Sequence, residues 1–169
     1  TIVRYLADGS LDTSFDNDGI RPLSLGSAAD QAYGVLVQSD GKLVVAGGAV
    51  LNSTTGGDFA LARLNADGSL DTSFDADGVA SLNISPTSVQ MATVLALADG
   101  TTLVGGYIEK SSTTTLATSS QYGAVWRLSA DGTLDTSFGT GGYFISTSSS
   151  LSTEGTLLQQ ADGKIVIVG

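Results

Sequence analysis

The sequence contains neither cysteine nor histidine. This excludes disulfides, thiol nucleophiles, Ser-His-Asp triads and zinc sites built from His or Cys within these 169 residues. Seven Lys and Arg stand against 17 Asp and Glu, which gives a net charge of −10. Such a surface repels phosphate backbones and anionic headgroups, so we expect no nucleic-acid binding. No apolar run is long enough to span a membrane, so we expect no membrane insertion either.

Proline is also scarce, with two residues, whereas Gly, Ser and Thr are abundant and nearly all the acidic residues are Asp. This composition predicts β-structure with many turns. It also fits a secreted or cell-surface bacterial protein, which is the localisation we expect.

One motif occurs three times: RYLADGSLDTSFDNDG from Arg4, RLNADGSLDTSFDADG from Arg63 and RLSADGTLDTSFGTGG from Arg127. A second motif, VQSDGKLVVAGG and its relatives, places Asp-Gly pairs at positions 40, 99 and 162. Successive copies of both motifs are 59 to 64 residues apart. The chain is therefore a tandem repeat with a period of about 60 residues.

Each period predicts four short strands. In the first complete unit these are Tyr33–Gln38, Lys42–Gly48, Phe59–Asn65 and Ser69–Phe74. Asp-Gly pairs separate the first from the second and the third from the fourth, which is a strong hairpin signal. No window shows a convincing helical period.

The second hairpin suggests a role for the repeated Arg and Asp. If Ala7-Asp8-Gly9 is a type I turn with Gly as the bulge residue, Leu6 pairs with Ser10, Tyr5 with Leu11 and Arg4 with Asp12. A tight two-residue loop would instead place Arg4 opposite Thr13. In the first register each unit has one cross-strand ion pair, and Asp12 can accept the Ser14 amide in an Asx-turn. We expect the same pairs at Arg63–Asp71 and Arg127–Asp135, and expect Phe15, Phe74 and Phe138 to fill the core between sheets.

The segments DFALARLNADGSLDTSFDADG and QSDGKLVVAGG resemble the bacterial delta-60 repeat, and the resemblance covers nearly the whole chain in three units. It implies a β-propeller in large, secreted or surface-attached proteins, and it transfers no catalytic motif. The chain departs from the family pattern at Asp16 and Asp75, where Gly follows Phe in the family, and at Leu97 and Thr101.

Both arguments predict an all-β chain, a β-propeller of four-stranded antiparallel blades, with a β-solenoid as the alternative. We expect an outer half-blade at 1–25, blades at 26–84 and 85–145, and an inner half-blade at 146–169. The total is three blade-equivalents, below the four to eight that close a propeller. We therefore expect the chain to assemble with further repeats of a longer chain, or with copies of itself in a ring or filament.

Two acidic turns are candidate calcium sites. DNDG and DADG place Asp16 and Asp18, and Asp75 and Asp77, two residues apart before a Gly. Calcium prefers closely spaced carboxylates on such turns. The spacing matches an EF-hand loop only in part, and a solvated turn is the alternative.

Two residues that break the repeat suggest a binding surface. Trp126 replaces Ala62 of the preceding unit, and Lys110 begins a Ser/Thr-rich insertion. An exposed Trp could stack on a sugar or a protein surface, whereas a buried one would fill space between blades.

The sequence favours a non-catalytic structural or binding module that contacts glycans or proteins, with no cofactor. One alternative is a glycan-acting enzyme using the non-repeated carboxylates Asp30, Asp58, Glu109 and Glu154. The other is a calcium-stabilised adhesin.

Overall fold

The computed structural model describes residues 1–25, 30–49, 58–82, 88–110, 120–147 and 156–168. Within these residues the chain forms strands and turns and no helix. The strands are β1 (Ile2–Val3), β2 (Ile20–Arg21), β3 (Gln31–Val37), β4 (Leu43–Ala49), β5 (Asp58–Leu64), β6 (Val79–Leu82), β7 (Ser88–Ala96), β8 (Thr102–Lys110), β9 (Ser120–Leu128), β10 (Tyr143–Ile145), β11 (Leu157–Gln159) and β12 (Ile165–Ile167).

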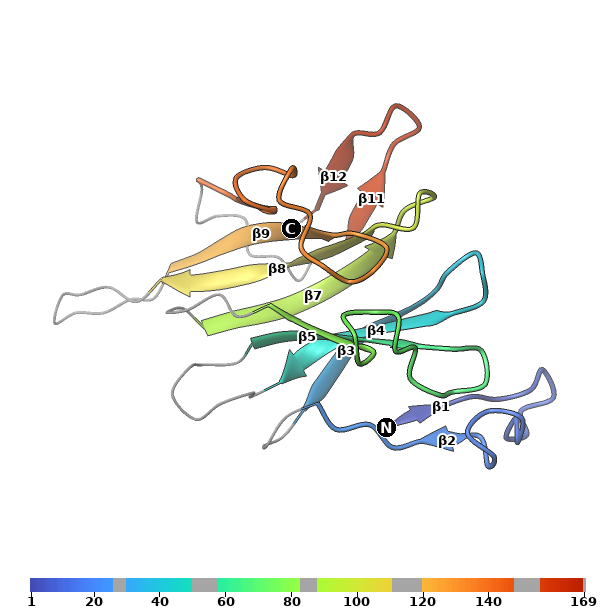
Figure 1. Cartoon of the computed structure of the whole chain (residues 1–169). Coiled ribbons are helices and arrows are strands. Elements are labelled where there is room, and N and C mark those ends of the chain that lie inside the picture. Colours follow the sequence, from blue (N-terminus) through green and yellow to red (C-terminus); the bar gives the residue numbers. More distant parts are fainter. Residues whose placement is uncertain (26–29, 50–57, 83–87, 111–119, 148–155, 169) are drawn as a thin grey trace, which may run out of the picture.

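These strands form two complete antiparallel sheets, β3-β4-β5-β6 and β7-β8-β9-β10. A two-stranded sheet precedes them (β1-β2) and another follows (β11-β12). In Figure 1 the four sheets follow one another in chain order, from the blue β1–β2 pair at the lower right to the red β11–β12 hairpin at the upper right. Consecutive antiparallel four-stranded sheets are the architecture of propeller blades and confirm the all-β prediction.

The first strands of successive sheets lie closest together. A Cβ added at Gly34 in β3 would stand 2.9 Å from Cγ1 of Val94 in β7. At the next junction, a Cβ added at Gly105 in β8, the second strand of its sheet, would stand 2.9 Å from Cδ1 of Leu157 in β11. In the two complete sheets, the first strands β3 and β7 are thus the inner edges.

The Asp-Gly turns have the geometry that the sequence predicts. In the first complete unit Gln38 N donates to Lys42 O at 2.8 Å, and Gly41 has a φ of +83°. The Asp40 carboxylate accepts the Lys42 amide at 3.1 Å and closes the turn. Glycine adopts this left-handed backbone without steric cost.

The fourth strand lies elsewhere than the sequence predicts. Ser69–Phe74 makes a single bridge, Leu64 with Leu70, and then leaves the sheet. The fourth strand is β6, which pairs with β5 from Phe59↔Leu82 to Ala62↔Val79. The Asp71 Asx-turn ends the ladder, because its carboxylate accepts the Ser73 amide at 3.1 Å and so turns the backbone.

Apolar side chains form three clusters, one between each pair of neighbouring sheets. The middle cluster contains residues of both complete blades, including Val44, Leu61, Phe74, Val104 and Trp126. The first cluster joins the β1–β2 half-blade to the first blade and includes Phe15. The last joins the second blade to β11–β12 and includes Leu157. The fold is therefore held together by packing between successive blades.

Candidate functional site

Among the described residues, the most extensive repeated polar arrangement is a cluster of Arg, Asp, Ser and Phe, which occurs once in each unit. We call it the clasp. Its members are Arg4, Asp12, Ser14 and Phe15 in the first unit, Arg63, Asp71, Ser73 and Phe74 in the second, and Arg127, Asp135, Ser137 and Phe138 in the third.

The Ala-Asp-Gly hairpin positions the clasp with the predicted bulged register. Leu6 N donates to Ser10 O at 2.8 Å, Tyr5 bridges Leu11, and Asp12 N donates to Arg4 O at 3.0 Å. This register places the Arg side chain opposite the Asp side chain in each unit. The Arg Nε–Asp Oδ2 distances are 2.8, 2.7 and 2.7 Å for Arg4–Asp12, Arg63–Asp71 and Arg127–Asp135.

The other oxygen of each clasp carboxylate, Oδ1, stabilises the turn that follows the Asp. Asp12 Oδ1 accepts the Ser14 amide at 3.0 Å and its hydroxyl at 2.6 Å, which confirms the predicted Asx-turn. The guanidinium of Arg4 lies 4.6 Å from the centre of the Phe15 ring. Corresponding contacts occur in the other two units. Each carboxylate therefore fixes both a turn and an arginine, and the arginine covers an aromatic ring.

These hydrogen bonds determine the charge state of the carboxylates. The Ser14 hydroxyl and amide lower the pKa of Asp12, and Ser137 does the same to Asp135. At Asp71 burial raises the pKa, but hydrogen bonds from Lys42, Ser73 and Arg63 outweigh it and hold the pKa well below its ordinary value. The clasp aspartates remain ionised at neutral pH and are poor general acids.

The clasp of one unit holds the Ala-Asp-Gly loop of the next unit. Nη1 of Arg4 donates to Ala66 O, and Asp16 N donates to Asp67 O at 2.8 Å. A Cβ added at Gly68 would stand 3.1 Å from the Phe15 ring. The ring therefore lies directly against this glycine, and Phe15 is fully buried as predicted.

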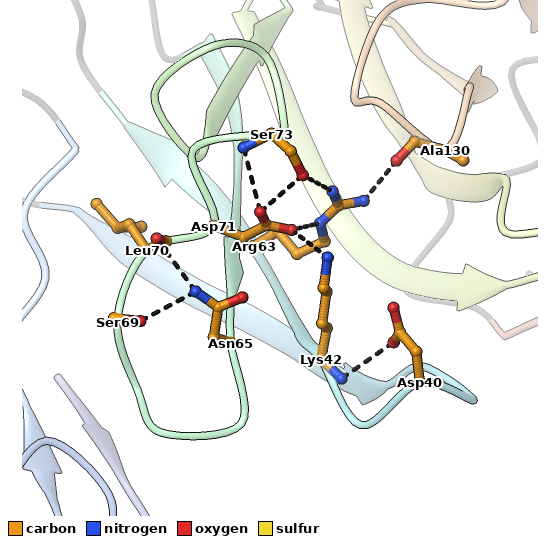
Figure 2. Close-up of polar contacts among 9 residues, drawn as sticks. All are labelled: Asp40, Lys42, Arg63, Asn65, Ser69, Leu70, Asp71, Ser73 and Ala130. Atoms are coloured by element: carbon orange, nitrogen blue, oxygen red, sulfur yellow. Dashed lines mark hydrogen bonds and ion pairs between the residues drawn. The ribbon is translucent and has the colours of Figure 1, made fainter.

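The second junction repeats this geometry. Nη1 of Arg63 donates to Ala130 O, as Figure 2 shows, and Asp75 N donates to Asp131 O at 2.7 Å. A Cβ added at Gly132 would stand 2.9 Å from the ring of Phe74, which is 1 % exposed. The repeated motif is thus a connector between neighbouring blades.

Sequence reasoning missed the receiving partners, Ala66, Gly68, Ala130 and Gly132. It also missed Lys42, whose Nζ donates to Asp71 Oδ2 at 2.7 Å (Figure 2). The residue types at these positions were visible in the sequence, but the contacts join distant positions: Arg4 and Ala66 are 62 positions apart, and Arg63 and Ala130 are 67 apart. One signal was available for Lys42, because Thr101 departs from the Lys at that position of the repeat.

Three of the four calcium candidates accept hydrogen bonds from residues that are close to them in the sequence. Asp16 Oδ1 accepts Arg21 Nη1 at 3.0 Å, whereas Asp18 and Asp77 accept the amides of Ile20 and Val79 at 2.8 Å. Asp75 follows Phe74 with a left-handed backbone, at φ +46°. Within the described ranges no group of three or more His, Cys, Asp or Glu is placed to hold a metal ion.

The proposed binding surface at Trp126 needs correction. Its side chain is 1 % exposed and meets Phe59 edge to face, with ring centres 4.5 Å apart and planes at 70°. Trp126 therefore fills the space between the two complete blades, which was the alternative, and no partner can stack on it. The side chain of Lys110 and the insertion after it lie outside the described part of the chain.

One pocket opens beside the first blade, with a volume of about 60 Å³, enough for a few water molecules. Thr1, Ile2, Gln31, Gly47 and other residues of β1, β3 and β4 line it, together with Asp30. Oδ2 of Asp30 accepts the Leu25 amide at 2.7 Å, and its buried Oδ1 has no partner among the described residues. Glu154 and the side chains of Asp58 and Glu109 lie outside the described part of the chain, so Asp30 is the one of the four proposed carboxylates whose side chain is placed.

The family comparison matches residues 1–15, 38–74 and 97–138 to a domain of unknown function, DUF5122, described as a beta-propeller. The first segment ends at the clasp residue Phe15, and the two longer ones each run from an Asp-Gly turn to the Phe of the next clasp; together they make up more than half of the chain. This protein belongs to the DUF5122 beta-propeller family. No curated protein and no solved structure matches the chain significantly. The described residues include no helix long and apolar enough to cross a membrane.

Proposed function

We propose that this DUF5122 domain is a non-catalytic structural or binding module of a secreted or cell-surface bacterial protein, in which the blades hold loops that contact glycans or proteins. The resemblance of its repeats to the delta-60 repeat, and a composition poor in Pro but rich in Gly, Ser, Thr and Asp, support the secreted or cell-surface setting.

One observation carries the non-catalytic part of the proposal. The chemically versatile residues that recur in the chain, Asp, Ser and Arg, are bonded to one another in each clasp. Asp12, Asp71 and Asp135 each hold both a serine and an arginine. A catalytic carboxylate instead needs a pKa near the operating pH and access to substrate. The clasp aspartates do not fit a general acid, because their hydrogen bonds lower the pKa, and both oxygens of each carboxylate already accept hydrogen bonds within the clasp.

A glycan panel tests the proposal, with binding and product release measured on the same samples. We expect no product release, whether or not a glycan is retained. Asp30→Asn is the informative variant, because Asp30 has an unpaired oxygen in the pocket, and Asp40→Asn, on an exposed turn, is its matched control. Turnover that Asp30→Asn abolishes and Asp40→Asn leaves unchanged would overturn the proposal.

A further inference from the structure

The sequence contains eight Asp-Gly pairs, and each of them is chemically able to rearrange. When the Asp carboxyl is protonated, the amide nitrogen of the following glycine can attack its Cγ, because glycine has no side chain to obstruct the approach. A C–N bond forms, the carboxyl hydroxyl and the amide proton leave as water, and a cyclic succinimide results. Water then opens the ring at either carbonyl and gives aspartate or isoaspartate. A folded turn slows the first step when other bonds hold the carboxylate and the glycine amide.

Two of these pairs occupy the same hairpin in the two complete blades. Asp40-Gly41 connects β3 to β4, and Asp99-Gly100 connects β7 to β8. Both aspartates are exposed, and the φ angles of the glycines are +83° and +86°. Both glycine amides donate to a carbonyl oxygen of the turn, at 3.0 and 3.1 Å. The two turns therefore have matching backbones, and a difference in their reactivity has to come from the side chains.

The two carboxylates differ in the hydrogen bonds that they accept. Asp99 Oδ1 accepts both the amide of Thr101, at 3.0 Å, and its hydroxyl, at 2.7 Å. Asp40 Oδ1 accepts the Lys42 amide at 3.1 Å but no side chain of the described residues, and the Lys42 ammonium is bound to Asp71 instead (Figure 2). The Thr101 hydroxyl and amide also lower the pKa of Asp99, so less of this carboxyl is in the protonated form that loses water.

The other six pairs are held more firmly or are covered. Four of them have a second bond, at 2.5–2.7 Å, from the side chain two positions after the Asp; these are Asp8, Asp67, Asp131 and Asp162. Asp18 and Asp77 accept an amide alone, but Gly19 and Gly78 are buried and their amides make short bonds of 2.7 Å. Asp40 is thus the one Asp of the eight pairs that combines a singly bonded carboxylate with a glycine that is not buried.

We propose that Asp40-Gly41 forms isoaspartate fastest of the eight pairs, because its carboxylate lacks the side-chain hydrogen bond that restrains the matching turn at Asp99. In isoaspartate the main chain passes through Cβ and Cγ and is one carbon longer. The turn closed by Gln38 and Lys42 then loses its bulged register. Because Lys42 also holds Asp71, the modification loosens a clasp as well as a hairpin. This inference is independent of the proposed function.

The first test incubates the folded protein at neutral pH, below its melting temperature, and locates isoaspartate by peptide mapping with electron-transfer fragmentation. We expect it to accumulate at Asp40 roughly five times faster than at Asp99, which is the factor that one additional hydrogen bond provides. In urea the two pairs should react at similar rates, because the turns are lost. Equal rates at Asp40 and Asp99 in the folded protein, or a faster rate at any other pair, would overturn the proposal. A difference of the same size in urea would also contradict it, since the local sequence would then be the cause.

The second test moves the hydroxyl between the two turns. Lys42→Thr should slow the reaction at Asp40 to the rate at Asp99, and Thr101→Ala should accelerate the reaction at Asp99. Lys42→Thr is the informative variant, because it removes the ion pair with Asp71 and so weakens the fold while it restrains the carboxylate. Asp40→Glu keeps the charge and is the negative control, since its longer side chain does not form the five-membered ring. An unchanged or faster reaction in Lys42→Thr would show that opening of the hairpin sets the rate, against the proposal.

Discussion

The second and third clasps have almost the same sequence and differ in what lies against them. Arg63 and Asp71 hold the Ala130 loop of the next unit, and their side chains are 8 % and 9 % exposed. Arg127 and Asp135 are equally close, at 2.7 Å, but hold no loop within the described chain and are 28 % and 20 % exposed. The motif therefore forms its own bonds locally. A neighbouring loop buries the ring, since Phe15 and Phe74 are 0 % and 1 % exposed. It does not by itself bury the ion pair, because the Arg4–Asp12 pair holds the Ala66 loop and its side chains are still 31 % and 18 % exposed.

The largest expected effect is a difference in stability between the alanine variants of Phe74 and Phe138. Phe74→Ala should lower the free energy of unfolding by about 3–5 kcal/mol, because the ring is buried between blades. Phe138→Ala should cost less than half as much, since this ring is only partly buried. Urea denaturation of both variants measures the difference. Equal losses would show that the clasp is insensitive to the neighbouring blade.

A smaller effect is expected at the receiving loop. Gly132→Ala places a Cβ 2.9 Å from the Phe74 ring at a φ of +91°, so it adds an overpacking cost of about 1–3 kcal/mol to a backbone strain of about 1–2 kcal/mol. Gly41→Ala incurs the strain alone, because nothing lies within 4 Å of its added Cβ. Thermal melts of both variants, in parallel with the unchanged protein, separate the two terms. A Gly132→Ala melt no lower than that of Gly41→Ala would argue against close packing at the junction.

The third difference depends on pH. Asp71 has a lowered pKa in the folded state, so the unfolded chain, with an ordinary value of 3.8, binds more protons at acid pH. The stability that Asp71 provides is thus complete above about pH 5 and is lost as the pH falls through 3.8 and below. Asp71→Asn should cost about 1–3 kcal/mol at pH 7, because it leaves Arg63 and Lys42 without their carboxylate. Asp71→Asn should also reduce the loss of stability between pH 7 and acid pH more than Asp135→Asn does.

Denaturation midpoints from pH 2 to pH 7 test this order. The two asparagine variants control for each other, because both keep the side-chain shape. An acid decline that is steeper in Asp71→Asn than in the unchanged protein would contradict a stabilising role for the ionised carboxylate.

The smallest effect concerns one substitution between units. Lys42 reinforces Asp71, whereas Thr101 occupies the same position in the next unit and leaves Asp135 to Arg127. Thr101→Lys should therefore gain about 0.2–1 kcal/mol, and Lys42→Thr should lose a similar amount. Both changes should shrink in 1 M salt, which screens such pairs. A gain that persists unchanged at high salt would rule out an ion pair as its source.

Much of the clasp could be predicted from the sequence because its bonds are local. The bulged register, the Arg4–Asp12 ion pair and the Asx-turn at Ser14 all follow from turn chemistry within eleven residues. The fourth strand could not be placed in this way. β6 has only four residues, too few for its alternation to stand out in the sequence, whereas Ser69–Phe74 has a typical strand composition but turns away at Asp71.

The contacts between units were also beyond sequence reasoning. Arg63 and Ala130 are 67 positions apart, and a repeat pattern does not say which copies touch. Trp126 shows the same limit, since its neighbour Arg127 gives no indication whether the indole faces solvent or the adjacent blade. In both cases the packing of the blades in three dimensions determines which residues meet, and a single sequence does not contain this information.

Each internal clasp holds the loop of the very next unit, and this has a consequence for how such a protein changes in evolution. Unequal recombination between tandem repeats adds or deletes coding segments of whole units. A gained unit brings its own Phe and Arg for the following neighbour, and its own Ala-Asp-Gly loop for the preceding one. Nearest-neighbour contacts of this kind make the stability of an array roughly the sum of its units and junctions. The number of blades can therefore change by inheritance in single steps without a compensating substitution.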